Sequence, residues 1–133
     1  MKRSYIGLAL GALVTFAALL TLPGCGHDQK LESIAINPSG ASITGAGVVV
    51  NFQAIGTFIH PPESKDITTS VVWMSAAPQV VSIVSNTGVA TSETGCGTNI
   101  TITATAYSNP QSKSGSVVVG TAAVSVKGNP GCP

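Results

Sequence analysis

Apolar and polar residues alternate along much of the chain after residue 30, in short segments that are rich in β-branched residues. The clearest alternation runs through Asn99–Tyr107, where Ile100, Ile102 and two alanines would lie on one face and three threonines on the other. A strict period of two is typical of a strand with one buried face. We therefore expect Ile100 and Ile102 to belong to the core.

Six further segments have strand-like composition and are separated by Gly, Pro, Asn and Ser. The predicted strands are Leu31–Asn37, Val48–Phe58, Val71–Ser75, Val80–Val84, Gly88–Ser92, Asn99–Tyr107 and Ser116–Lys127. In the second strand, Phe52 shares a face with Val50 and Ala54, which predicts that Phe52 is in the core. In the last strand, Gly120 predicts a bulge that changes the phase upstream of it.

Seven strands in about 100 residues, with frequent turn residues between them, predict an all-β fold. The spacing favours an antiparallel β-sandwich of the immunoglobulin (Ig) type. A small barrel or a jelly roll would show the same local pattern, so periodicity leaves these alternatives open. We find no internal repeat and no sign of a second domain.

The first 24 residues have the pattern of an export signal. A short basic stretch, Met1–Tyr5, precedes an uninterrupted run of apolar, Gly and Thr residues, Ile6–Leu22. A helix of that length spans only about 25 Å, and no basic stop-transfer cluster follows it. The pattern therefore favours a cleaved signal peptide over residues 1–24, and a transmembrane helix is the alternative.

The segment Leu22-Pro23-Gly24-Cys25 resembles the lipobox of bacterial lipoproteins. This resemblance implies cleavage between Gly24 and Cys25, followed by acylation of Cys25, with palmitate among the chains that it would carry. Ordinary cleavage that leaves Cys25 as a thiol is the alternative. Residues 25–30 would form the lipidated Cys and a short tether, and residues 31–133 the domain. Gly26 in place of Asp after the Cys implies the outer membrane, if the host has one.

Charge is sparse, which excludes some function classes. Hydrophobic residues make up 44% of the chain and charged residues 8%, with six Lys+Arg against five Asp+Glu. Without Lys2 and Arg3, four Lys remain against five acidic residues, a net charge near −1. A nucleic-acid binder needs clustered Lys and Arg, so we expect no nucleic-acid partner. The expected partner is a membrane, bound through the N-terminal lipid.

Three cysteines are an odd number, and acylation of the first leaves Cys96 and Cys132 as one possible pair. If Tyr107 lies opposite Ser116 in the last hairpin, Cys96 lies opposite Lys127, and the turn residues that follow bring Cys132 back. An exported protein meets conditions that permit a disulfide. Two free thiols are the alternative.

The sequence contains no recognisable catalytic set and no metal-binding motif. The two histidines lie near no second ligand, and there is neither a Cys-x-x-Cys nor an Asp-x-Asp-x-Asp segment. A Gly-x-Ser-x-Gly segment is also absent, and nothing assembles a nucleophile with an oriented base. We therefore expect a protein that is not an enzyme and needs no cofactor.

Several spaced motifs together resemble the bacterial Ig-like domain, group 2. They are Leu31-x-x-Ile34-x-Ile36-x-Pro38, Phe52-Gln53-Ala54-x-Gly56-Thr57, Asp66-Ile67-Thr68, Val72-Trp73-x-Ser75, Pro78-x-Val80-x-x-Ile83, Gly88-Val89-Ala90 and Ile100-Thr101-Ile102-Thr103-Ala104. The match covers residues 31–127. It departs from the family at Ser75-Ala76-Ala77 and at Val72 and Met74. The resemblance implies a β-sandwich of bacterial surface proteins, with Trp73 in the core.

Val72 and Met74 stand where the family has polar residues. If they point outward, they form an apolar strip for a partner, and the alternative is that a neighbouring loop covers them. The predicted function is a lipid-anchored envelope module that acts in adhesion, as a spacer or as an accessory subunit binding protein or polysaccharide. A cell-surface carbohydrate-binding module is the alternative, for which Phe58 and Tyr107 are the candidate exposed aromatics.

Overall fold

The computed structural model describes residues 28–130 and Cys132, so the predicted signal peptide, its cleavage site and Cys25 lie outside the described residues. The described part contains ten strands and no helix, which confirms the all-β prediction but not the count of seven. No helix in this part could therefore cross a bilayer. The strands are β1 (Lys30–Asn37), β2 (Gly40–Thr44), β3 (Val49–Asn51), β4 (Gln53–Ile59), β5 (Glu63–Asp66), β6 (Val72–Ser75), β7 (Val81–Ile83), β8 (Val89–Ser92), β9 (Gly97–Asn109) and β10 (Ser114–Lys127).

The strands form an Ig-like β-sandwich of two layers. One layer is the four-stranded sheet β2-β10-β9-β6. The other contains the sheets β1-β4-β5 and β3-β8-β7, which follow one another because only Phe52 separates β3 from β4. Every pairing is antiparallel except that of β2 with β10, which is parallel.

The core lies between the two layers and is built from alternate residues of both. Each of the predicted core residues is buried, with exposed fractions of 2% for Phe52, 1% for Trp73, 7% for Ile100 and none for Ile102. The rings of Phe52 and Trp73 contact each other, with centroids 6.3 Å apart. Burial of large aromatic side chains supplies much of the apolar area that a domain of this size needs.

The segment predicted as one strand over Val48–Phe58 is two strands in two sheets. The first part, β3, pairs with β8, and the second part, β4, pairs with β1 and β5. At Phe52, between them, the backbone N–H donates to the carbonyl of Gly88 at 2.9 Å. The alternation of buried and exposed residues continues through this junction, so local periodicity cannot show where a strand changes its partner.

The sequence did not predict β2 or β5. Ile43 is the one buried residue of β2, and all four residues of β5 are exposed. Both strands lie at the edge of a sheet and pair on one side only. Short edge strands need no alternating apolar pattern, and the charges of β5 protect its free edge from pairing with another chain.

The register of the last hairpin differs from the prediction by one residue. Tyr107 lies opposite Val117 instead of Ser116. An irregularity between Ser114 and Val117 adds the extra residue on β10, close to the turn. Nothing in the alternation of β10 marks this position, because its neighbours near the turn are all exposed.

Gly120 is not a bulge, contrary to the prediction. It lies in regular register opposite Ala104, and the inward phase of β10 continues through it. A Cβ atom at Gly120 would lie 2.7 Å from the carbonyl oxygen of Ile34 in β1. The glycine therefore allows the backbones of the two layers to approach closely.

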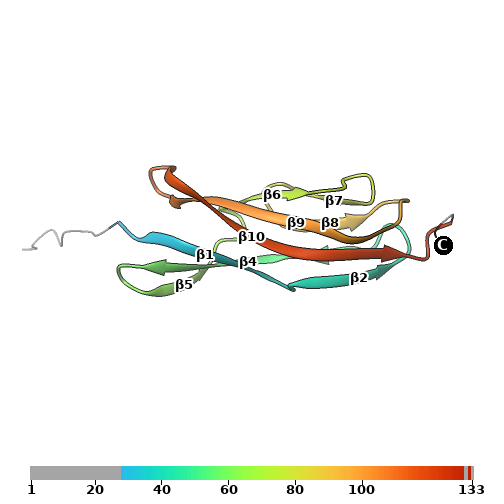
Figure 1. Ribbon diagram of the computed structural model, residues 1–133, viewed down its shortest axis with the longest axis horizontal. Helices are drawn as coiled ribbons and strands as arrows, with labels where there is room; N and C mark the ends of the chain where they lie inside the picture. Colours follow the sequence, from blue (N-terminus) through green and yellow to red (C-terminus); the bar gives the residue numbers. More distant parts are fainter. Residues whose placement is uncertain (1–27, 131, 133) are drawn as a thin grey trace, which may run out of the picture.

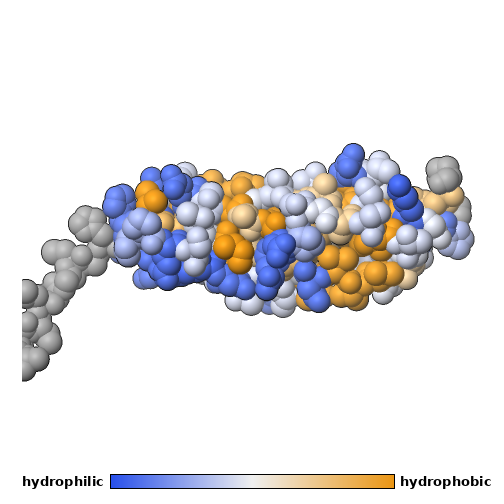
Figure 2. Space-filling model, turned by 90° about the horizontal axis from the view of Figure 1, so that it is seen from below, coloured by the Kyte–Doolittle hydropathy of each residue, from blue (hydrophilic) through white to orange (hydrophobic). Residues whose placement is uncertain are grey.

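The molecule is elongated, and the described chain begins at one end of the long axis and finishes at the other (Figure 1). The β4–β5 turn and the β9–β10 hairpin lie at the end where β1 begins. The β2–β3 and β8–β9 connections lie at the C-terminal end. Figure 2 shows that apolar side chains reach the surface in separate patches on the side drawn, the larger one toward the C-terminal end.

Candidate functional site

The four-stranded sheet exposes a row of apolar side chains on its outer surface. They are Val72 (54% exposed), Met74 (60%), Tyr107 (45%), Val117 (59%) and Val119 (52%), and together we call them the outer apolar face. Of the two alternatives left open by the sequence for Val72 and Met74, the structure has the outward one, and no loop of the described residues covers them. The exposure of Tyr107 was also expected, whereas sequence reasoning missed Val117 and Val119, although they occupy the solvent side of a strand in which the inward residues were recognised.

The register explains why these side chains lie together. Val72 and Val119 flank Thr105 from the two neighbouring strands, and Val117 lies opposite Tyr107. The hydroxyl of Thr105 donates to the carbonyl oxygen of Val72 at 3.3 Å, and that of Thr103 donates to the carbonyl of Met74 at 3.5 Å. Because these bonds engage the hydroxyls within the sheet, the central strand adds little polar character to the face.

An open depression of about 460 Å³ adjoins this face beside the β9–β10 hairpin. Its lining includes Val72, Ala106, Tyr107, Pro110, Lys113 and Val117. A second depression of about 190 Å³ shares Ala106 and Pro110 with the first and includes Gln29. The two therefore adjoin, and they lie at the end of the molecule where the described chain begins. An apolar hollow with one cationic side chain suits the binding of an apolar surface or ligand.

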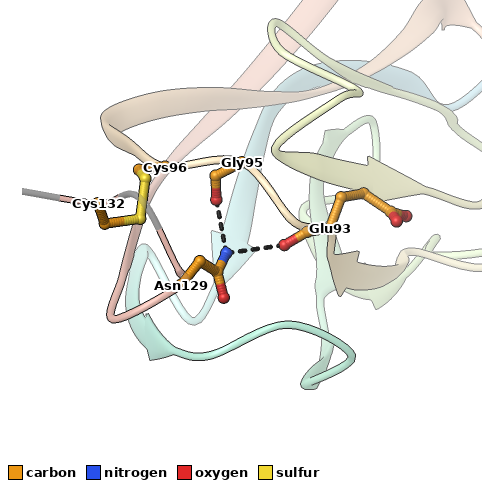
Figure 3. The surroundings of a disulfide bond; sticks show 5 residues. All are labelled: Glu93, Gly95, Cys96, Asn129 and Cys132. Carbon is orange, nitrogen blue, oxygen red and sulfur yellow. Dashed lines mark hydrogen bonds between the residues drawn. A yellow bond between two sulfur atoms is a disulfide. The ribbon is translucent and has the colours of Figure 1, made fainter.

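The predicted disulfide between Cys96 and Cys132 is confirmed, with the two Cα atoms 5.7 Å apart. It joins the β8–β9 connection to the segment that follows β10 (Figure 3). The backbone N–H of Cys132 donates to the carbonyl of Asn129 at 3.0 Å, which closes a turn before the bond. This crosslink lies at the end opposite to the start of the described chain.

Asn129 supports the disulfide and was not identified from the sequence. Its side chain is 4% exposed, and its Nδ2 donates to the carbonyls of Glu93 at 2.9 Å and Gly95 at 2.6 Å (Figure 3). Its Oδ1 is buried and has no hydrogen-bond partner among the residues that the structure describes. An Asn beside Pro and Gly is typical of an exposed turn, so nothing in the local pattern indicates this burial.

Trp73 is held in the core by a hydrogen bond from its ring. The Nε1–H donates to the carbonyl of Thr68 at 2.8 Å. The hydroxyl of Thr68 accepts from the N–H of Ala54 at 2.9 Å and donates to Asp66 at 2.5 Å. A buried and bonded indole has no face for a ligand, so Trp73 is a structural residue and not a sugar platform.

Two exposed carboxyl groups, those of Glu63 and Asp66, have pKa values below their ordinary values. Hydrogen bonds from Gln29 and Lys65 lower the pKa of Glu63, and the hydroxyl and N–H of Thr68 lower the pKa of Asp66. Lys65 also forms an ion pair with Glu63 at 3.0 Å. Within residues 28–130 and Cys132, no group of three His, Cys, Asp or Glu residues is placed to hold a metal ion.

Phe58 is not exposed, so the expectation that it could contact a sugar is wrong. Its side chain is 6% exposed because it continues the inward face of Ala54 and Gly56 along β4. The Nζ of Lys65 covers its ring, 5.5 Å from the centroid. Among the aromatic residues that the structure describes, Tyr107 alone is exposed.

No protein-family model matches this chain, and no curated protein sequence matches it. The resemblances to the group 2 bacterial Ig-like domain and to the lipobox therefore stay predictions from the sequence motifs. The fold, the disulfide and the outer apolar face rest on the structure.

Proposed function

We propose that the chain is a lipid-anchored, non-enzymatic Ig-like module of the bacterial cell envelope, which acts in adhesion, as a spacer or as an accessory binding subunit. One observation carries this proposal: the described chain begins and finishes at opposite ends of an elongated sandwich (Figure 1). An anchor at Cys25 would hold one end of the module at the membrane. The end that carries the Cys96–Cys132 disulfide would then point away from the anchor.

The outer apolar face gives this module a surface for a partner. Its five side chains are about half exposed or more, and they form a continuous row across three strands. Contiguous apolar groups on the surface of a soluble domain are typical of interaction sites. The face carries no nucleophile with an oriented base, which supports a binding role over a catalytic one.

A carbohydrate-binding module is the weaker candidate. Flat sugar-binding surfaces need several exposed aromatic rings, and here Phe52, Phe58 and Trp73 are buried. Tyr107 would have to supply the stacking by itself within the described residues. We therefore favour the module with an apolar contact surface.

The substitution Cys25→Ser tests the proposed anchor. We expect the variant to lose the mass of the acyl chains and to leave the membrane fraction, because each buried CH₂ contributes about 0.8 kcal/mol to membrane binding. Mass spectrometry of the N-terminal peptide and fractionation of cells provide the two measurements. Gly26→Ser, which keeps the cysteine, is the matched control. A Cys25→Ser variant that stays bound as tightly as the unaltered chain would contradict the proposal.

A further inference from the structure

We propose that the outer apolar face rests on the anionic headgroups of the same bilayer that holds the anchor, so that the module leans on the membrane. This inference depends on the proposed lipid anchor and names the partner of the exposed face. It follows from the position of the face, the chemistry of its side chains and the distribution of charge over the two layers.

The length of chain between the anchor and the domain places the face close to the bilayer. Cys25 is four residues before Gln29, and four residues span at most about 14 Å. Gln29 lines the smaller depression, which shares Ala106 and Pro110 with the hollow beside Val117. The point of lipid attachment therefore lies within about 14 Å of Gln29, at the edge of the two adjoining depressions beside the outer apolar face.

The side chains at this end suit the interface between lipid and water. Tyr107 combines an apolar ring with a hydroxyl, the combination that is enriched at the headgroup level of membranes. Val72 and Val117 are more than half exposed on either side of it and would bury apolar area on contact. Lys113 lies in the adjoining hairpin, and its Nζ forms no ion pair or hydrogen bond with the described residues.

The charges of the two layers determine which side faces an anionic surface. The strands β2, β6, β9 and β10 and the β9–β10 hairpin contain no Asp or Glu, and their charged residues are Lys113 and Lys127. At the same end, strands β1 and β5 of the other layer carry three acidic residues, Glu32, Glu63 and Asp66, against two lysines, Lys30 and Lys65, which leaves a net charge of −1. Anionic headgroups would repel those carboxylates and attract Lys113, so the layer with the outer apolar face turns toward the bilayer.

A pair of tryptophan variants of the full, acylated chain tests this orientation. Tyr107→Trp reports on the outer apolar face, and Val49→Trp is the matched control. Val49 is as exposed as Val72, at 54%, but it lies in the other layer, opposite Thr91 and next to the β8–β9 connection. Val48 and Val84 are also exposed. Exposed apolar side chains are therefore not confined to the outer apolar face, which makes Val49 a suitable control. Trp73 is buried and gives both variants the same background emission.

The proteins are bound to vesicles of phosphatidylethanolamine and phosphatidylglycerol that carry bromine atoms near the headgroups. We expect the added emission of Tyr107→Trp to shift to the blue and to fall about twofold, as for a ring at the lipid interface. The emission of Val49→Trp is expected to stay unchanged. Equal quenching of both variants, or no quenching of Tyr107→Trp, would overturn the inference. A blue shift without quenching would overturn it as well, because protein, such as a second copy, would then cover the face.

Lys113→Gln tests the contribution of the headgroup charge, with Lys127→Gln at the opposite end as its control. In the Tyr107→Trp background, replacing phosphatidylglycerol by phosphatidylcholine is expected to reduce the quenching, and Lys113→Gln is expected to remove that dependence on lipid charge. An equal effect of Lys127→Gln would count against the proposed orientation. The mass of the N-terminal peptide is measured in each sample. An unacylated Cys25 would refute the anchor itself, whereas an acylated and bound chain without quenching refutes only the orientation.

Discussion

Thr68 links three parts of the molecule through its side chain and its carbonyl. Its hydroxyl bonds to the backbone N–H of Ala54 in β4 and to the carboxylate of Asp66, while its carbonyl accepts from the ring of Trp73. The short turn after β5 thus fixes the indole from outside the core. Residues of this kind are exposed in part and have no apolar signal, yet they hold the largest core side chain in place.

Substitution of Thr68 is predicted to change the acidity of Asp66. The Thr68 hydroxyl and N–H hold the pKa of Asp66 below its ordinary value, so the folded state favours the ionised carboxylate. The resulting stabilisation is present above the ordinary pKa and is lost as the pH falls through the lowered pKa. Thr68→Val removes the larger cause, so we expect the pKa of Asp66 to rise toward its ordinary value and the loss of stability that this group causes at acid pH to become smaller.

Carbon-13 NMR titration of the Asp66 carboxyl group measures this change. Thr68→Ser keeps the hydroxyl and is the control, in which the pKa should stay low. Thr68→Val also leaves the N–H of Ala54 without its partner, which we expect to cost about 1–2 kcal/mol in the free energy of unfolding. An unaltered pKa of Asp66 in Thr68→Val would show that the hydroxyl is not its cause.

Gly88 is predicted to be the least replaceable of the turn glycines. Its φ is +72°, and a Cβ atom there would lie 2.5 Å from the carbonyl oxygen of Phe52 and 3.0 Å from the ring of Trp73. Gly88→Ala should therefore lower the free energy of unfolding by about 3 kcal/mol, measured by denaturant titration. Gly47→Ala is the matched control, since its φ is +75° but nothing lies within 4 Å of its Cβ position. It should lose only about 1 kcal/mol, and an equal loss in both variants would disprove the steric argument.

At the scale of elements, the chain uses edge strands and a divided strand to close the sandwich. β2 pairs in parallel with the end of β10, while β3 and β4 divide one apolar segment between two sheets. The disulfide adds a further connection, since it joins the β8–β9 connection to the chain that follows β10. Asn129 ties the same two segments together through two hydrogen bonds.

Removal of the disulfide is predicted to destabilise this end of the fold. Cys96→Ala together with Cys132→Ala should lower the free energy of unfolding by about 3–4 kcal/mol, because the bond closes a loop with a sequence separation of 36. Denaturant titration of the domain measures the loss. Asn129→Ala, which keeps the disulfide, should cost about 1–2 kcal/mol. Since both act on the same segments, we expect the combined loss to differ from the sum of the separate losses. An unchanged midpoint without the disulfide would contradict this account.

At the scale of the whole molecule, the acidic side chains near the start of the chain and the outer apolar face lie in different layers. The carboxylates near the start of the chain belong to the β1-β4-β5 sheet, and the outer apolar face belongs to the sheet that contains no acidic residue. Together with a short connection to the proposed anchor at Cys25, this asymmetry would orient the module. The anchor and orientation experiments above therefore test successive steps of one arrangement, first whether the chain is held and then which side it turns to the bilayer.

Alternation along single strands was enough to identify the all-β fold and the core. Ile100, Ile102 and Phe52 could be assigned because burial on one face of a strand imposes a period of two on the sequence. The disulfide partners could be named from the number of cysteines and the position of the last hairpin. The expectations for Gly24 and Cys25 also come from the sequence, and they concern residues outside the described part of the chain.

The sequence by itself determined the strand type, the buried faces and the Cys96–Cys132 pair, since each depends on residues that are neighbours in the chain or few in number. Only the tertiary structure decided which strands pair. Strands pair through backbone hydrogen bonds, which nearly every residue can form, so the order of side chains says little about which strand is the partner. The tertiary structure therefore divided Val48–Phe58 between two sheets, made Gly120 a point of close approach, and buried Asn129 and Phe58. It also brought Val72 and Met74 beside Thr105 and Thr103, which are 33 and 29 positions away, because a surface forms only when distant strands lie side by side.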